Sequence, residues 1–304
     1  MKPNLLAILL AIALASPCLS QDIEPRRWTP LPVGTNVVGF GYGSASGDTT
    51  FDPVLNVENA KTSVDSVAFS FVKPIALARR TARLDVLIPQ LNARWDGLID
   101  GRPQTVKRSG LGDPIVRFSF NFLGSPARRL KEFIEQNRKN AGKSKTVAGA
   151  ALSLTLPWGE YQSDKLLNLG QNRYTLRPQV GVVHTRGDWS FELTGSTFIH
   201  SDNDDFFNGG TRSQDPLYAA QTHLIKVFKP GLWAAISMGY GNGGKSEVNG
   251  VSKNDRRESV LQAFTLGLPL TRSQNMKMAY IRTNAKNNLG STLDSFIIAW
   301  SHMF

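Results

Sequence analysis

Residues 294–304 read DSFIIAWSHMF and end the chain. In an extended strand successive side chains point to opposite faces, so every second residue shares a face. On one face lie Phe296, Ile298, Trp300 and Phe304. A side-chain period of two is typical of a half-buried β-strand and not of a helix. The stretch therefore predicts a final β-strand with one strongly apolar face.

The same period recurs throughout the chain, and most of the segments that show it are about 9 to 13 residues long, enough to cross a membrane as tilted strands. They begin near Thr35, Ser63, Thr81, Gly112, Lys145, Arg173, Trp189, Tyr218, Leu232, Arg256, Asn275 and Asp294. These segments predict an all-β fold: a transmembrane antiparallel up-and-down β-barrel of about 12 strands over residues 35–304. Alternation is expected to place apolar side chains toward lipid and polar ones toward the lumen.

The connections between these segments alternate in length. Counted from the first segment, the odd connections hold 9 to 20 residues and the even ones 3 to 8, except for one of 22. A barrel with both termini in the periplasm has this rhythm, because its outer loops are long and its periplasmic turns are short. A soluble β-sandwich of twelve strands is the alternative, but nothing in that fold requires its loops to alternate.

The exceptional connection covers residues 123–144. Leu130, Phe133 and Ile134 fall at helical spacing in it, and six basic residues outnumber its two glutamates. We expect a short basic amphipathic helix in a periplasmic connection. The helix could plug the lumen, lie on the inner leaflet of the outer membrane, or pack in solvent against the barrel rim.

The N-terminus carries a targeting signal. Lys2 precedes an apolar run from Leu5 to Ala15 and then small residues, which is the pattern of a secretory signal peptide over residues 1–20. Lipidation of Cys18 is an alternative that Pro17 disfavours, and eleven apolar residues are too few for an anchor helix. Residues 21–34 are expected to form an N-terminal periplasmic segment. Cleavage leaves no cysteine, and hence no disulfide or cysteine metal site.

The charge bears on the partners. The full chain carries +11, and +10 remains after the signal peptide with Lys2 is removed. In an exported protein this indicates contact with anionic lipid headgroups, such as lipopolysaccharide, or anionic solutes, and not with nucleic acid. The terminal phenylalanine of the last strand resembles the assembly signal of bacterial outer-membrane barrels, so the barrel-assembly machinery is a further expected partner. His302 departs from the residue usual in that signal.

Polar residues on the inward positions of the strands are predicted to line the lumen. They are Arg83, Asp85, Arg117, Asn121, Arg177, Gln179 and Glu192. Such side chains are costly against lipid and can be solvated or paired inside a barrel. A conducting lumen of this composition would mildly prefer anions or electron-rich rings. The alternative is that the seven residues form a mutual hydrogen-bonded network, which would leave a non-conducting structural or surface-binding barrel.

The sequence offers two further candidate sites. Asp202, Asp204 and Asp205 offer oxygen ligands for calcium in an outer loop, although their spacing is not that of an EF-hand and a solvated loop is favoured. An outer-membrane lipid hydrolase would need a serine beside a histidine, and His200 is the only plausible base. The histidines are scattered and no nucleophile motif is present, so we expect neither catalytic residues nor a cofactor.

Several stretches together resemble a known family, called Putative MetA-pathway of phenol degradation. They are RSGLGDPIVRFSFNFLGSPA (108–127), LPWGEY (156–161), NLGQNRYTLRPQVGV (168–182), QDPLY (214–218) and PGLWAAI (230–236). Tyr174 stands where the family pattern has tryptophan. The resemblance implies an outer-membrane barrel that passes small aromatic or hydrophobic compounds. It names no substrate, because the family label reflects gene association.

Overall fold

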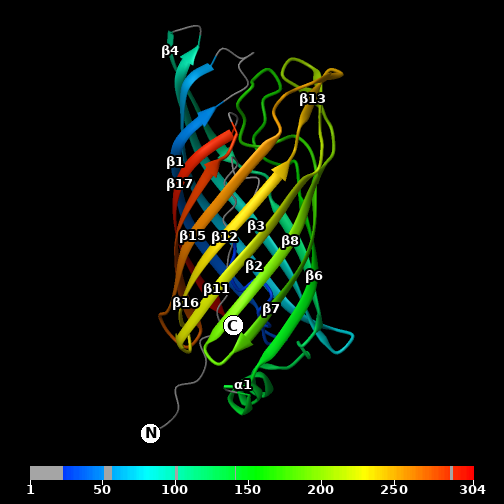
Figure 1. Cartoon of the computed structure of the whole chain (residues 1–304), viewed down its shortest axis with the longest axis vertical. Coiled ribbons are helices and arrows are strands. Elements are labelled where there is room, and N and C mark those ends of the chain that lie inside the picture. The colour runs from blue at the N-terminus through cyan, green and yellow to red at the C-terminus, as the bar shows by residue number, and fades with distance from the viewer. Residues whose placement is uncertain (1–22, 51–56, 100–101, 141, 288–289) are drawn as a thin grey trace.

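The computed structural model describes residues 23–50, 57–99, 102–140, 142–287 and 290–304, which form a closed antiparallel β-barrel (Figure 1). The signal peptide predicted over residues 1–20 lies outside these residues. The wall strands are β1 (Val37–Thr50), β2 (Val57–Leu77), β3 (Arg80–Ile99), β4 (Arg102–Leu111), β5 (Ile115–Leu123), β6 (Lys145–Thr155), β7 (Thr175–Arg186), β8 (Trp189–His200), β11 (Leu217–Lys229), β12 (Leu232–Gly243), β15 (Arg257–Pro269), β16 (Gln274–Ala285) and β17 (Gly290–Met303). Because β4 and β5 both pair with β3, one above the other, these 13 strands fill twelve positions. The predicted transmembrane barrel is confirmed.

The barrel closes between the first and the last strand. β1 pairs antiparallel with β17 from Val37 opposite Met303 to Thr50 opposite Gly290. One step further, Asn36 and Phe304 exchange both backbone hydrogen bonds, at 2.8 and 2.9 Å. The terminal residue of the chain is therefore part of the seam, and its side chain stands outward with 60% of its surface exposed.

The strand starts agree with the predicted ones at Lys145, Trp189 and Leu232, but two strands are much longer than expected. β2 has 21 residues and β3 has 20. The predicted 18-residue loop after the third strand is instead a hairpin, in which β4 pairs with the upper half of β3. Both faces of that hairpin are polar, for example at Arg94 and Asp96, so hydrophobic alternation could not reveal it.

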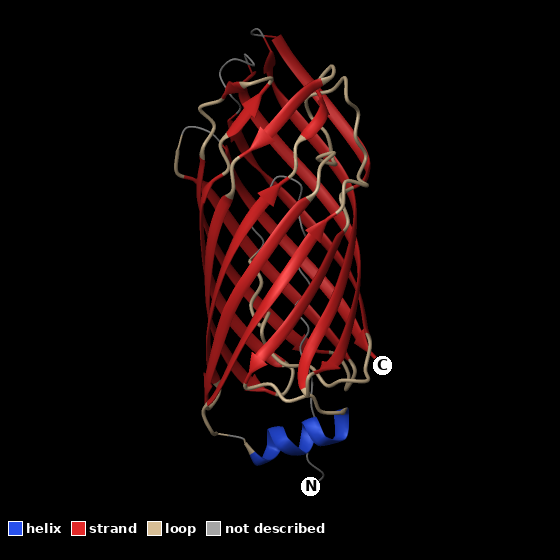
Figure 2. Ribbon diagram, turned by 90° about the vertical axis from the view of Figure 1, so that its right-hand side faces the viewer, coloured by secondary structure: helices blue, strands red, loops and turns tan. Residues whose placement is uncertain are grey.

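One end of the barrel has short turns. The predicted eight-residue connection between the second and third strands is a two-residue turn, Ala78–Arg79, in which both residues have positive φ. The exceptional connection forms the predicted helix, α1 (Leu130–Lys139), which lies outside this end of the barrel (Figure 2). Phe133 is the buried residue of α1 and joins a cluster that includes Leu31 and Val37. The helix thus packs against the rim and does not plug the lumen.

The opposite end carries the long connections. Parts of two of them form a small four-stranded sheet of β9 (Asn203–Phe206), β10 (Gly210–Gln214), β13 (Ser246–Val248) and β14 (Val251–Ser252). It stands above the barrel wall near β13 in Figure 1. This pairing satisfies the backbone groups of loops that would otherwise cross the mouth unpaired. Among the described residues, no helix is long and apolar enough to cross a membrane.

The outer surface marks the level at which the barrel leaves lipid. Below this level the outward positions carry large apolar side chains such as Phe69, Ile236 and Phe296. At the level itself, outward tyrosines donate hydrogen bonds to carboxylates on the neighbouring strand. The pairs are Tyr42 with Asp65 (2.8 Å), Tyr280 with Asp294 (2.5 Å) and Tyr240 with Glu258 (3.2 Å). Tyrosines with one apolar and one wet end are typical of a membrane interface.

Aromatic rings also line the lower outer surface beside the seam. Phe40 packs on Phe69 and on Trp300, with ring centroids 5.3 and 6.4 Å apart. Trp300, His302 and Phe304 then continue as a stack down β17 to the end of the chain. The lipid-facing part of β17 therefore runs from about Phe296 to Phe304, with tyrosine and carboxylate groups above it.

A lysine at Ile298 tests this membrane placement. Ile298 faces outward between Tyr42 of β1 and Met278 of β16, so Ile298→Lys puts a charge into the apolar band at a cost of about 2 to 4 kcal/mol. We expect a clearly lower folded fraction, measured by heat-modifiable migration in detergent. The control is Thr292→Lys, on the same strand beyond Asp294, which should fold as the wild type does. Equal folded fractions for Ile298→Lys and wild type would contradict the placement.

Candidate functional site

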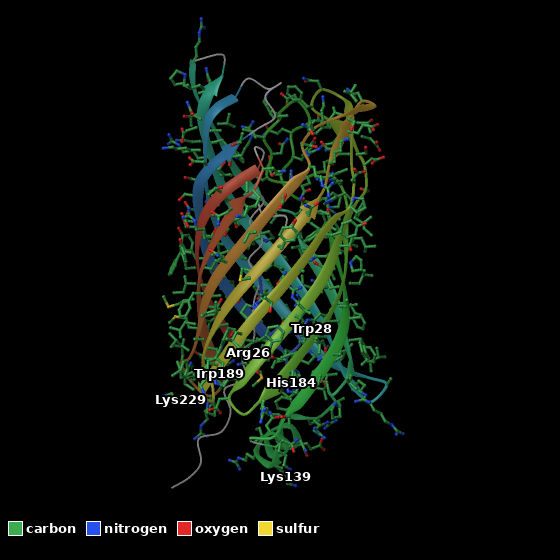
Figure 3. The ribbon with its side chains drawn as sticks, viewed as in Figure 1. Arg26, Trp28, Lys139, His184, Trp189 and Lys229 are labelled. Atoms are coloured by element: carbon green, nitrogen blue, oxygen red, sulfur yellow. The ribbon has the colours of Figure 1, made fainter. Side chains whose placement is uncertain are left out.

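Within the segment predicted as periplasmic, residues 21–34, the part from Glu24 to Leu31 packs against the inner face of the barrel, whereas Val33 pairs with Arg129 at the rim. Glu24, Arg27 and Trp28 are 1, 3 and 0% exposed, and Figure 3 shows Arg26 and Trp28 within the lower part of the barrel. A turn closed by Thr29, whose N–H donates to the carbonyl of Arg26 (3.2 Å), folds the segment on itself. The segment is short, contains prolines and has no hydrophobic period, so its sequence pattern predicts no location. Its partners lie on several distant strands.

Trp28 fixes the segment to one side of the barrel wall. Its indole Nε1 donates to the hydroxyl of Thr194 (2.8 Å), and its carbonyl accepts from the side-chain amide of Asn121 (3.2 Å). The ring lies over Gly149 and Gly181, which are paired across β6 and β7. A Cβ at Gly181 would come within 2.1 Å of the indole nitrogen. Glycine is therefore required there to let the ring approach the wall.

An ionic network connects the segment to β3 and β5. The carboxylate of Glu24 accepts from Arg27 at 2.7 Å and from Arg117 at 3.1 Å. Arg117 also contacts Asp85 at 2.6 Å, and Asp85 contacts Arg83 at 2.9 Å. Buried charges are tolerated only when paired and hydrogen-bonded, and here each named group has an opposite charge within 3.1 Å.

A second set of contacts joins the segment to β7 and β8. The guanidinium of Arg27 donates to the amide oxygen of Gln179 (2.7 Å), and its backbone N–H donates to the carboxylate of Glu192 (3.1 Å). Arg177 lies on the same side, with its guanidinium carbon 4.4 Å from the ring centroid of Phe198. All seven residues predicted to line the lumen are on the inward positions of this polar side, and six of them are less than 9% exposed. Their contacts with the N-terminal segment were not predicted.

The other side of the lumen carries an apolar cluster between polar inward residues such as Ser66, Thr265 and Ser295, whereas alternation predicted a polar lining. It is built by inward residues of β15, β16, β17, β1 and β2, and Leu31 of the N-terminal segment packs with them. The residues are Val37, Ala68, Val72, Leu261, Ala263, Ala279, Ile281 and Ile297. We call this surface the apolar wall. Both faces of these strands carry hydrophobic residues, so the sequence period alone could not tell the inner face from the outer one.

Three of the quoted sequence stretches meet at the outer end of the barrel. Asp113, between β4 and β5, accepts backbone hydrogen bonds from Gly159 (2.9 Å) and Gln171 (2.8 Å). Glu160 donates its N–H to the carbonyl of Leu111 (2.7 Å). A Cβ on Gly159 would come within 2.8 Å of the Asp113 nitrogen, so only glycine allows this approach. These hydrogen bonds hold the connections around the mouth to the barrel wall at the point where β4 ends and β5 begins.

The structure places the calcium candidates and His200 apart from the partners that their predicted sites would need. Asp202, Asp204 and Asp205 are all exposed, and no cluster of three metal-ligating side chains occurs within the described residues. His200 faces inward, and its Nδ1 shares a hydrogen bond with the hydroxyl of Thr175 (2.9 Å) and not with a serine. The row predicted as an assembly signal, ending at Phe304, stands on the outer surface, and its role in assembly stays a prediction.

Gly181→Ala tests the position of the N-terminal segment. The added methyl group overlaps the indole of Trp28, so we expect the segment to leave the wall and Arg26 and Arg27 to become accessible to trypsin. The matched control is Gly195→Ala on β8, where a Cβ has no neighbour within 4 Å. Cleavage is followed by N-terminal sequencing of the folded barrel. If both variants resist trypsin like the wild type, the segment is not held by this contact.

Solved structures share the barrel architecture. An outer membrane channel from Pseudomonas putida F1 has 24% sequence identity and a TM-score of 0.74, with 93% of this chain and 100% of that chain covered. The transport unit of the autotransporter AIDA-I from Escherichia coli has 10% identity and a TM-score of 0.51, with 89% and 91% covered. The translocator domain of NalP from Neisseria meningitidis has 10% identity and a TM-score of 0.50, with 90% of each covered. At these identities the likeness concerns the fold.

The comparison by sequence is more specific. No protein of curated function matches the chain. The family model described as Putative MetA-pathway of phenol degradation matches residues 34–279, which include all the stretches that suggested the resemblance. Because this model covers most of its length, the chain belongs to the Putative MetA-pathway of phenol degradation family.

Proposed function

We propose that this protein is an outer-membrane channel for small organic solutes of hydrophobic character. The observation that supports the proposal is the apolar wall on the inner face of the barrel, whose residues are at most 9% exposed because they pack with one another and with Ile23 and Leu31 of the N-terminal segment. The inside of a water-filled barrel is normally polar, so an apolar surface there is costly unless it contacts something apolar. Each square ångström of apolar surface that a solute removes from water contributes about 25 cal/mol.

The asymmetric interior fits this function. The polar side of the lumen is covered by the N-terminal segment through Glu24, Arg27 and Trp28. The apolar wall lies on the opposite strands, and Ala68, Ala263 and Ala279 keep its side chains short. Twelve strands enclose an interior between that of filled eight-stranded barrels and that of open porins. A solute that crosses this barrel would contact the apolar wall and the N-terminal segment.

The proposed location is the outer membrane of a Gram-negative bacterium, reached through cleavage of the signal peptide at residues 1–20. The apolar exterior, the tyrosine level and the barrel fold support it. Outer-membrane lipid, lipopolysaccharide and the barrel-assembly machinery would then be the partners. Nδ1 of His223 shares a hydrogen bond with the hydroxyl of Ser237 (2.8 Å), but the two residues are 0 and 1% exposed inside the barrel, so we propose transport and not catalysis.

Deleting residues 23–34 tests whether the N-terminal segment limits passage. The deletion removes Trp28 and Arg27 from the lumen, so we expect a larger single-channel conductance in planar bilayers than for the full chain. Trp28→Ala is the smaller change and should give an intermediate value. Heat-modifiable migration confirms that each variant is folded. A barrel that carries no current in any of the three forms would refute the channel and leave a structural or surface-binding barrel.

Substitutions of Ala279 test the apolar wall. Ala279 faces the lumen between Thr265 and Ile297, and Ala279→Asn places an amide there with the same number of non-hydrogen atoms and the same branching as Ala279→Leu. We expect Asn to slow the uptake of naphthalene by cells that express the variant several-fold more than Leu does. Uptake is normalised to the amount of folded barrel. If Asn and Leu slow uptake equally, size and not polarity limits passage, and the proposed role of the apolar wall is wrong.

A further inference from the structure

Three arginines converge at the outer mouth of the barrel, above the tyrosine level. Arg173 precedes β7, Arg212 lies on β10 of the small sheet, and Arg257 begins β15. Gln214, two residues after Arg212 on the same face of β10, accepts a hydrogen bond from Nη2 of Arg173 at 2.5 Å. Arg257 lies on the inward face of β15, four residues before Leu261. Three elements far apart in sequence therefore bring these arginines to the outer mouth, where the charges of Arg212 and Arg257 act on Arg173.

Arg173 is the most constrained member of this cluster. It is 6% exposed, and its hydrogen bonds go only to the neutral amide oxygens of Gln171 and Gln214. Its third nitrogen, Nη1, is buried and has no hydrogen-bond partner in the described part of the chain. Burial, together with the charges of Arg212 and Arg257, lowers the pKa of Arg173 to about 9. Its charged form thus lacks the compensation that a buried guanidinium normally has.

The nearby carboxylates are engaged elsewhere. Asp113 accepts from the backbone of Gly159 and Gln171, and Asp255 accepts from the backbone and hydroxyl of Ser246 at 2.7 and 2.5 Å. Asp202 is exposed. Within the described residues, none of the three arginines forms an ion pair with a carboxylate within 4 Å. Among the described residues, the mouth therefore holds three clustered arginines without a direct ion pair to a carboxylate.

We propose that this cluster is a binding site for the carboxylate of an aromatic organic acid that enters the lumen. Guanidinium groups match the two oxygens of a carboxylate, and Arg173 holds an unused donor for it. Aromatic rings are close at hand, since Arg212 lies 5.3 Å from the ring centroid of Phe206, and Phe198 lies two residues below His200 on the inward face of β8. The inference rests on the proposed channel and names the class of solute that its mouth selects.

The test measures binding to the refolded full-length protein by equilibrium dialysis at constant ionic strength. The probes are benzoate and its neutral analogue benzyl alcohol. We expect Arg257→Gln and Arg173→Gln to raise the Kd for benzoate about 10- to 100-fold, as for loss of a charged hydrogen bond, and to leave benzyl alcohol binding unchanged. The control is Arg256→Gln, which removes the same charge from an exposed neighbour whose guanidinium donates to Asn242.

The outcomes separate this site from the channel. Equal benzoate affinity in wild type, Arg257→Gln and Arg173→Gln would overturn the site, and so would an equal loss in Arg256→Gln. Conductance of the same preparations is recorded independently. If the barrel conducts but binds benzoate and benzyl alcohol equally, the channel is supported and the carboxylate site is refuted. If the barrel binds benzoate through these arginines but carries no current, the binding site is supported and the channel is refuted.

Discussion

The hydrocarbon interior of a membrane offers no hydrogen-bond partner to a peptide group, and the rest of this structure depends on that constraint. A sheet that crosses lipid must pair every edge, which it does here by joining β1 to β17 along their full lengths. The last backbone hydrogen bonds of the seam involve Phe304 itself. The chain end is therefore a structural part of the wall, with its aromatic ring on the lipid side.

Closure creates an interior whose two sides differ in chemistry. Carboxylates and guanidinium groups gather on β3, β5, β7 and β8, while from β15 to β2 an apolar cluster faces inward among small polar side chains. The polar side could not remain buried and unpaired, because uncompensated charges are costly at low dielectric. The N-terminal segment supplies the missing partners, in particular the carboxylate of Glu24 between Arg27 and Arg117. The apolar wall packs with Ile23, Leu31, Leu87 and Phe133, and it offers a passing solute hydrophobic contact on the other side of the barrel.

The outer mouth is held together by other interactions than the lumen. Its connections are held by backbone hydrogen bonds to Asp113 and by glycines that permit close approach, so that side chains such as Arg173 are placed precisely. Positive charge is paired with carboxylates deep in the barrel, whereas Arg173 at this outer end has no ion pair among the described residues. An anionic group would therefore meet its strongest attraction before it reaches the apolar wall. Such an order suits a solute with a charged head and an apolar ring.

The sequence by itself determined the barrel, because alternation over some ten residues, short glycine turns and a terminal phenylalanine are local properties of the chain. It also determined that Arg83, Arg117 and Glu192 point inward, since a period of two assigns a face to every residue of a strand. Only the tertiary structure decided which residues meet inside. Trp28 reaches Thr194 and Gly181 across more than 150 positions, and a segment without period carries no signal of its partner. The same holds for the arginines at the mouth, because their proximity arises from the closure of the barrel and not from their spacing in the chain.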